Sequence, residues 1–130
     1  KAFNKALVNK LYTTPHIPFL NLGDLYMELK EYEKAEEAYR ESKGFVNIEW
    51  TVIKLGTALL EAGRTKEAIR EFQEGIGLAP QNANMRFSLG LAYLKAGNKK
   101  SALTEFKKAA ELAPKSDLAQ KASEYIKILR

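Results

Sequence analysis

The sequence predicts an all-α fold, an α-solenoid in which antiparallel helix hairpins stack side by side. The dipeptide Leu-Gly recurs at residues 22–23, 55–56 and 89–90, at intervals of 33 and 34 residues. Apolar residues around each copy recur at helical spacing. Such a period is typical of repeat proteins, whose hairpins bury their apolar faces against their neighbours. With 130 residues, 45% of them hydrophobic, one folded domain is expected.

Each copy carries two further landmarks. An alanine follows the glycine by twelve residues, and an aromatic residue follows that alanine by four. Glycine within a helix costs about 1 kcal/mol relative to alanine, so its recurrence predicts a facing helix that approaches too closely for a side chain. The alanines are Ala35, Ala68 and Ala102, and the aromatic residues are Tyr39, Phe72 and Phe106.

Turn signals divide the chain into elements. Gly63 and Gly97 mark tight turns within two hairpins, whereas Lys30-Glu31-Tyr32 takes that place in the first hairpin without a glycine. Ser116 is a candidate N-cap for a last helix that closes the stack. The expected helices lie at about 16–30, 32–43, 48–62, 65–77, 82–96 and 99–112.

The single domain, 1–130, is therefore expected to contain three repeats at 16–48, 49–82 and 83–115, followed by a capping helix at 116–130. Upstream, Phe3-x2-Ala6-Leu7 looks like the second helix of an earlier repeat. Residues 1–15 would then hold that helix and a connector, and the partner helix of this half-repeat is missing.

Together the landmarks resemble the tetratricopeptide repeat, whose pattern is W-x2-L-G-x2-Y, then A-x3-F, then P, over 34 residues. Phe19-x2-Leu22-Gly23-x2-Tyr26 fits this pattern best. The resemblance covers residues 17–115 and relaxes at Val52 and Arg86, where the pattern has Trp. It implies a superhelix that catalyses nothing and binds another protein in a concave groove.

The resemblance also implies which residues face that groove, because partners of this family usually lie against the first helices of successive repeats. Trp50 is a candidate anchor for an apolar helix or an extended peptide. One subgroup grips the acidic tails of heat-shock chaperones with Lys, Asn and Arg, but apolar or acidic residues stand at several of these positions here, so that mode is disfavoured. The alternative is that these side chains pack against adjacent helices. The expected partner-binding residues are Ile17, Leu20, Asp24, Met27, Trp50, Ile53, Lys54, Thr57, Asn84, Phe87, Leu91 and Lys95.

Composition argues against several other classes. The net charge of +5 arises after Arg64, where lysines alternate with apolar residues at helical spacing; this favours a solvated helix face over a nucleic-acid or lipid surface. Five glutamates between residues 31 and 41 lack the spacing of a calcium loop and are expected to pair with Lys34 and Arg40. No apolar run approaches the roughly 20 residues that span a bilayer, so membrane insertion by these residues is not expected.

Catalytic and metal-binding residues are also not expected. The chain has no cysteine, and its single histidine, His16, lies in a connector without clustered carboxylates. No nucleophile, base and oxyanion donor can be nominated together, and no glycine pattern suits a phosphate. The sequence therefore predicts no cofactor and no enzyme activity.

Three settings for such a scaffold remain open. The connector 9–15 resembles that of PilF/PilW-type lipoproteins of type IV pilus biogenesis, which implies a bacterial, periplasmic, outer-membrane-anchored factor in pilus or secretin assembly. A second setting is a generic, cytoplasmic recognition module of a larger regulator or enzyme. A third is a homo-oligomer, because the half-repeat at 1–8 leaves an unpaired stacking face.

Overall fold

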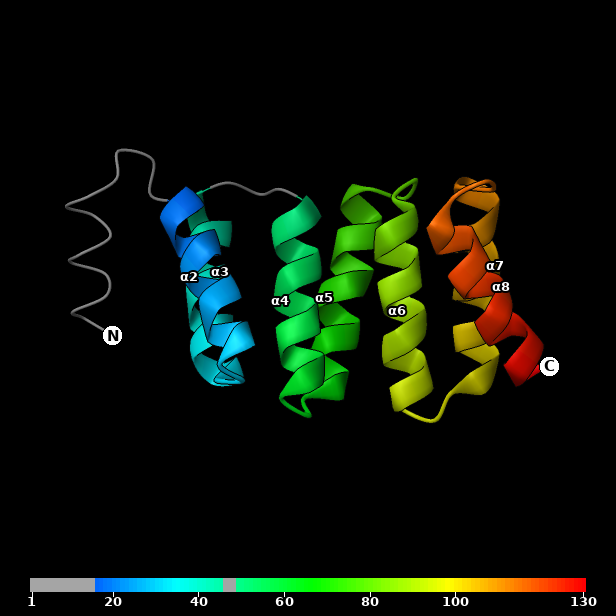
Figure 1. Ribbon diagram of the computed structural model, residues 1–130, viewed down its shortest axis with the longest axis horizontal. Coiled ribbons are helices and arrows are strands. Elements are labelled where there is room, and N and C mark those ends of the chain that lie inside the picture. Colours follow the sequence, from blue (N-terminus) through cyan, green and yellow to red (C-terminus); the bar gives the residue numbers. More distant parts are fainter. Residues whose placement is uncertain (1–15, 46–48) are drawn as a thin grey trace.

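The computed structural model describes residues 16–45 and 49–130. Within these ranges the chain forms seven α-helices and no strand, and the helices stand side by side along the long axis (Figure 1). They are α2 (His16–Glu28), α3 (Tyr32–Phe45), α4 (Glu49–Glu61), α5 (Thr65–Leu78), α6 (Ala83–Lys95), α7 (Lys99–Leu112) and α8 (Asp117–Leu129).

This architecture confirms the predicted all-α stack of hairpins. Each expected helix agrees with an observed helix to within two residues at either end. The last helix, α8, begins after Ser116, whose hydroxyl accepts a hydrogen bond from the backbone N–H of Ala119 at 3.0 Å, as an N-cap does. The helix expected at 1–8 and the connector at 9–15 lie outside the described residues.

The glycine of each Leu-Gly pair lies against an aromatic ring on the second helix of its hairpin. A side chain there would collide, because real Cβ atoms essentially never approach another heavy atom more closely than 3.0 Å. The glycines therefore allow the close helix contact that their recurrence predicts. A Cβ atom would lie 2.4 Å from Tyr39 at Gly23, 2.4 Å from Phe72 at Gly56 and 2.7 Å from Phe106 at Gly90.

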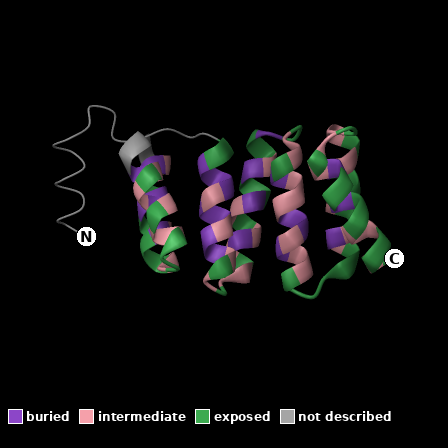
Figure 2. Ribbon diagram, viewed as in Figure 1, coloured by how far each residue is buried: buried purple, intermediate pink, exposed green. Residues whose placement is uncertain are grey.

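The core lies between these helices. The recurring alanines, Ala35, Ala68 and Ala102, are fully buried, as is the Leu55 side chain of α4. Buried residues are frequent on α4 and α5 in the middle of the stack, whereas α8 is largely exposed along its outer side (Figure 2). The middle hairpin therefore contributes most to the core, and α8 covers one end.

The turns inside the hairpins share one geometry. Gly63 and Gly97 have φ of 84°, and Lys30 has φ of 60°, so a lysine takes the left-handed conformation where the other hairpins have glycine. Each turn is closed by the paired backbone hydrogen bonds of a Schellman motif. In each pair, the hydrogen bond that spans more residues has a donor–acceptor distance of 2.9 Å; these bonds run from the N–H of Glu31 to Tyr26, of Arg64 to Leu59 and of Asn98 to Tyr93.

Candidate functional site

The first helices of the hairpins, α2, α4 and α6, carry the expected partner-binding residues. Helix α4 contacts α6, and α6 contacts α8, so these helices are neighbours across the stack. Helix α2 is joined to α4 by an ion pair between Asp24 and Lys54. We call the surface shared by α2, α4, α6 and α8 the first-helix face.

Asp24 is the centre of a polar cluster on this face. Its carboxylate accepts hydrogen bonds from Lys54 Nζ at 2.9 Å and from the Tyr39 hydroxyl at 2.6 Å. Burial, and then the hydrogen bond to Asp24, raise the pKa of the Tyr39 phenol far above its ordinary range, so the phenol keeps its proton and donates it. The cluster joins three helices and neutralises the Lys54 charge within the protein.

Trp50 lies beside this cluster, in the first turn of α4. Lys54 Nζ lies 5.2 Å from the centre of its indole ring, a cation–π contact that is worth about 0.5–1 kcal/mol at an exposed site. The Trp50 side chain is nevertheless 54% exposed. A large aromatic ring is therefore held in place while much of its surface remains in water.

The two neighbouring positions on α4 offer less to a partner. Ile53 is only 8% exposed and packs in the core. The Thr57 hydroxyl donates to the carbonyl of Ile53 at 2.8 Å, so its proton is already used within the helix. Of the expected partner-binding residues on α4, Trp50 and Lys54 thus offer most to a partner.

At the other end of the face, Phe87 of α6 belongs to an aromatic cluster. Its ring centre lies 5.4 Å from that of Phe106 and 5.9 Å from that of Tyr125. Tyr125 stacks on Phe106 with ring centres 4.8 Å apart and an interplanar angle of 13°. A surface hollow lies over this cluster, lined by Phe87, Lys121, Glu124, Tyr125 and Ile128.

Four of the residues that line this hollow, all on α8, were not expected from the sequence. The sequence analysis assigned this last helix to closing the stack, and no residue of it to the groove. A signal was present, because continuing the 34-residue period from Phe87 reaches Lys121, and continuing it from Leu94 reaches Ile128. The helix has lost the Leu-Gly landmark but keeps the register of the first helices.

The remaining expected residues are divided between core and surface. Leu20 and Met27 are partly buried and pack against the main core, and Leu91 packs against the cluster around Phe106. Asn84 and Lys95 are exposed on α6. Ile17 lies in α2, but its side chain is outside the described part of the structure.

Of the five glutamates expected to pair with Lys34 and Arg40, the structure pairs Glu31 and Glu36 with them. Lys34 pairs with Glu31 at 2.8 Å and Arg40 with Glu36 at 2.9 Å. The network also crosses to the next hairpin, which the sequence did not indicate, because Lys43 pairs with Glu71 of α5 at 3.0 Å. The pair between Lys43 and Glu71 fastens α3 to α5, and neither helix belongs to the first-helix face.

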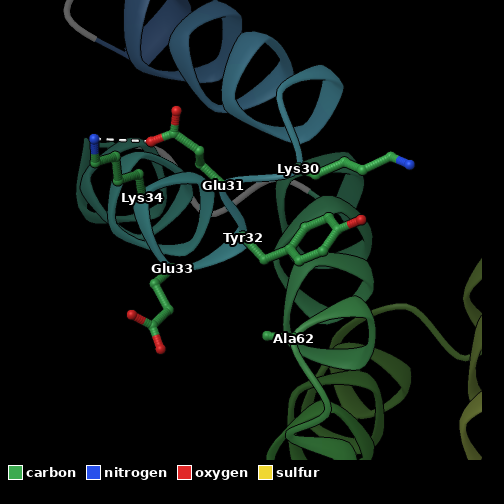
Figure 3. A pocket seen from close by; sticks show the side chains of 6 residues that line it. All are labelled: Lys30, Glu31, Tyr32, Glu33, Lys34 and Ala62. Carbon is green, nitrogen blue, oxygen red and sulfur yellow. Dashed lines mark ion pairs between the residues drawn. The ribbon is translucent and has the colours of Figure 1, made fainter.

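A further hollow lies where the turn between α2 and α3 meets the end of α4. Its lining residues are Lys30, Glu31, Tyr32, Glu33, Lys34 and Ala62. Figure 3 shows Glu31 and Lys34 turned toward one another, with Lys30 and Glu33 extending away in different directions. The charged groups thus do not converge on a common point.

The described residues form neither a metal site nor a membrane-spanning helix. No group of three or more His, Asp or Glu side chains in residues 16–45 and 49–130 is arranged to hold a metal ion. No helix in the same ranges combines the length and the apolar character that a bilayer crossing requires.

Comparison with family models identifies the repeat. Residues 53–117 match a model described as tetratricopeptide repeat, and residues 19–44 match a second model with the same description. A curated relative, the human protein O-mannosyl-transferase TMTC1, is 32% identical over 74 residues. That match covers 57% of this chain but 8% of the human protein, so the chain corresponds to a small part of it.

Solved structures share the fold at low sequence identity. PcrH from Pseudomonas aeruginosa has a TM-score of 0.83 at 16% identity, covering 92% of this chain and 94% of PcrH. The first such domain of Spaghetti (RPAP3), bound to the HSP90 peptide SRMEEVD, has a TM-score of 0.79 at 13% identity, with 91% and 92% covered. SycD of Yersinia enterocolitica, in complex with a peptide of the translocator YopD, has a TM-score of 0.78 at 16% identity, with 85% and 88% covered.

Proposed function

Since this chain belongs to the tetratricopeptide-repeat family, we propose that it is a non-catalytic scaffold that binds a partner protein on its first-helix face, with Trp50 as an anchor. The observation that carries the proposal is the half-exposed Trp50 ring, held by Lys54 on a helix of that face. Large aromatic residues that are fixed before binding contribute most to many protein interfaces.

The chemistry around Trp50 favours an apolar segment as the occupant. Lys54 is already paired with Asp24, so a partner carboxylate at this point would compete with an existing ion pair. An apolar helix or extended peptide would instead cover the indole ring without disturbing that pair. Two proteins with the same fold hold peptides, and this supports the proposal by analogy of fold.

The setting of the scaffold is a narrower question. The match to a short part of a much longer human protein supports the alternative that this chain acts as one module of a larger protein. A role in type IV pilus or secretin assembly rests on the connector 9–15, which is outside the described residues, and the comparisons do not support it. The proposal here is therefore limited to protein binding.

The test is to capture the partner from native extract, to identify it by mass spectrometry and to measure its affinity for the purified chain by calorimetry. Trp50→Ala is expected to weaken binding about 30-fold or more, as loss of an interface anchor does. Leu78→Ala is the matched control, because Leu78 is 58% exposed but lies on α5. Equal affinity of the Trp50→Ala variant and the native chain would refute the anchor.

Self-association is tested in the same preparation by sedimentation velocity. If a second copy of the chain is the occupant, a dimer that Trp50→Ala dissociates should form at high concentration. A monomer that still binds the captured protein would leave the heterologous partner as the occupant.

A further inference from the structure

We propose that the hollow between α6 and α8, which we call the C-terminal pocket, binds an apolar side chain of the partner that is flanked by carboxylates. This inference rests on the proposed function and adds to it a second contact point, the chemistry of the partner and its direction along the first-helix face. The pocket is lined by Phe87, Lys121, Glu124, Tyr125 and Ile128.

The apolar part of the C-terminal pocket is fixed in advance. The Tyr125 ring stacks on Phe106, whose side chain is fully buried, and the Phe87 ring packs against both. These contacts leave the rings little freedom to lose when a ligand binds, which favours affinity. Ile128 is 77% exposed at the edge of the same pocket, so a partner side chain that fills it would also cover Ile128.

The charges of the segment from the end of α6 to the end of the chain, which includes α8, are strongly unbalanced. Residues 95–130 contain nine Lys and Arg residues against four Asp and Glu residues. Among the ion pairs between described residues, one involves an acid of this group: Glu105 pairs with Arg86, which lies outside the group. None of the nine cations forms an ion pair within the described residues, so their combined potential attracts an acidic segment.

This end of the face therefore differs from the end at Trp50. There the cation, Lys54, is neutralised by Asp24, whereas Lys121 in the C-terminal pocket forms no ion pair with any residue that the structure describes. Glu124 is the one acid in the pocket lining, and a partner carboxylate should approach on the Lys121 side. A bound segment would then place its apolar part on Trp50 and its acidic part at α8.

A protein segment is favoured over nucleic acid as the occupant. Nucleic acid carries the negative charge that lysines attract, but its phosphate backbone offers no aliphatic side chain to fill a hollow lined by Phe87, Tyr125 and Ile128. A peptide in which leucine is flanked by acidic residues supplies both groups. The apolar lining of the pocket, together with the excess of cations in residues 95–130, is thus the specific argument for an acidic peptide.

The experiment is a residue-resolved NMR titration of the isotopically labelled chain with two end-blocked peptides. One peptide has a central leucine flanked by aspartates and glutamates, and in the other each acid is replaced by lysine. The acidic peptide is expected to shift the amide signals of Lys121, Tyr125 and Ile128 saturably, and less so as salt is added. The basic peptide is expected to leave them in place.

Two variants and two matched controls complete the test. Lys121→Glu and Ile128→Ser are each expected to weaken binding of the acidic peptide about tenfold. The controls make the same kind of change elsewhere on the surface. Lys66→Glu, on α5, repeats the charge reversal, and Leu29→Ser replaces an aliphatic side chain that is 56% exposed beyond the end of α2. Both controls are expected to bind like the native chain.

The results that overturn the inference are distinct from those that overturn the proposed function. No saturable shift at α8, equal shifts with both peptides, or competition by a short DNA duplex would each refute the C-terminal pocket as an acidic-peptide site. Shifts confined to the surroundings of Trp50 would refute the C-terminal pocket and leave the proposed function standing. The proposed function itself fails only if Trp50→Ala binds the captured partner unchanged.

Discussion

Replacing Gly56 with alanine tests one of the two closest contacts between a glycine and the facing helix among the described residues. In an exposed helix the change would gain about 1 kcal/mol, because alanine is the better helix former. Here the new Cβ would lie 2.4 Å from the Phe72 ring, about 1 Å short of ordinary contact. Phe72 is fully buried, so the ring cannot turn out into solvent. Overpacking of a core costs about 1–3 kcal/mol. Subtracting the gain in helix propensity from the upper value gives an expected net loss of about 2 kcal/mol in the free energy of unfolding.

The matched control for this change is Gly77→Ala in α5. A Cβ at Gly77 meets no atom within 4 Å, so the substitution is expected to gain up to about 1 kcal/mol by helix propensity alone. Urea unfolding followed by circular dichroism and by the fluorescence of Trp50, the single tryptophan, measures both variants. If Gly56→Ala is as stable as Gly77→Ala, the argument from close approach is wrong.

Three further substitutions are each tested by urea or thermal unfolding. Lys30→Gly is expected to gain about 0.5–1 kcal/mol, because Lys30 holds φ of 60° where glycine is unstrained; Gly97→Ala, at φ of 84°, is expected to lose a similar amount. Thr51→Val is expected to gain about 1 kcal/mol, because the buried Thr51 hydroxyl has no hydrogen-bond partner among the described residues; a loss would show that it has one. Tyr39→Phe is expected to lose about 1–2 kcal/mol with its hydrogen bond to Asp24. Because the pKa of Tyr39 is raised in the folded state, its contribution to the free energy of unfolding is complete below the unfolded-state pKa of about 10 and falls as the pH rises above that value. The difference in stability between the native chain and Tyr39→Phe should therefore become smaller in alkali.

The fold was predictable because its steric demands recur in the sequence. Where the two helices of a hairpin touch, only glycine fits opposite the aromatic ring. A glycine and an aromatic residue at a fixed spacing, such as Gly56 and Phe72, therefore indicate the hairpin more specifically than a hydrophobic pattern alone. The turn at Lys30 was placed correctly despite lacking glycine, because the period located it. Its left-handed backbone could not be predicted from a lysine.

The candidate site was less predictable, for two physical reasons. Successive residues of a helix lie about 100° apart around its axis, so residues three apart, such as Trp50 and Ile53, lie on the same side of the helix. The period alone therefore does not show that Ile53 faces the core whereas Trp50 faces solvent. The pairing of Lys54 with Asp24 depends on the approach of two helices thirty residues apart in the chain. Nothing in the local pattern of either helix reports that distance.

The C-terminal pocket was missed for a different reason. Its α8 half no longer carries the landmarks that define a repeat, and an amphipathic last helix is fully explained by closing the stack. The exposure of Ile128 and the stacking of Tyr125 on Phe106 depend on how α8 packs against α6 and α7, which the sequence of α8 alone does not show.

The stacking of neighbours also sets how the chain comes apart. Among the described residues, extensive contacts join only helices that are adjacent or next but one in the chain. Unfolding can therefore begin at either end while the hairpin of α4 and α5 stays folded, and hydrogen exchange should be slowest in that middle hairpin. A partner that lies along the face from α2 to α8 would bridge elements that otherwise do not meet. Its binding should then appear as a sharper, more concerted melting of the whole stack.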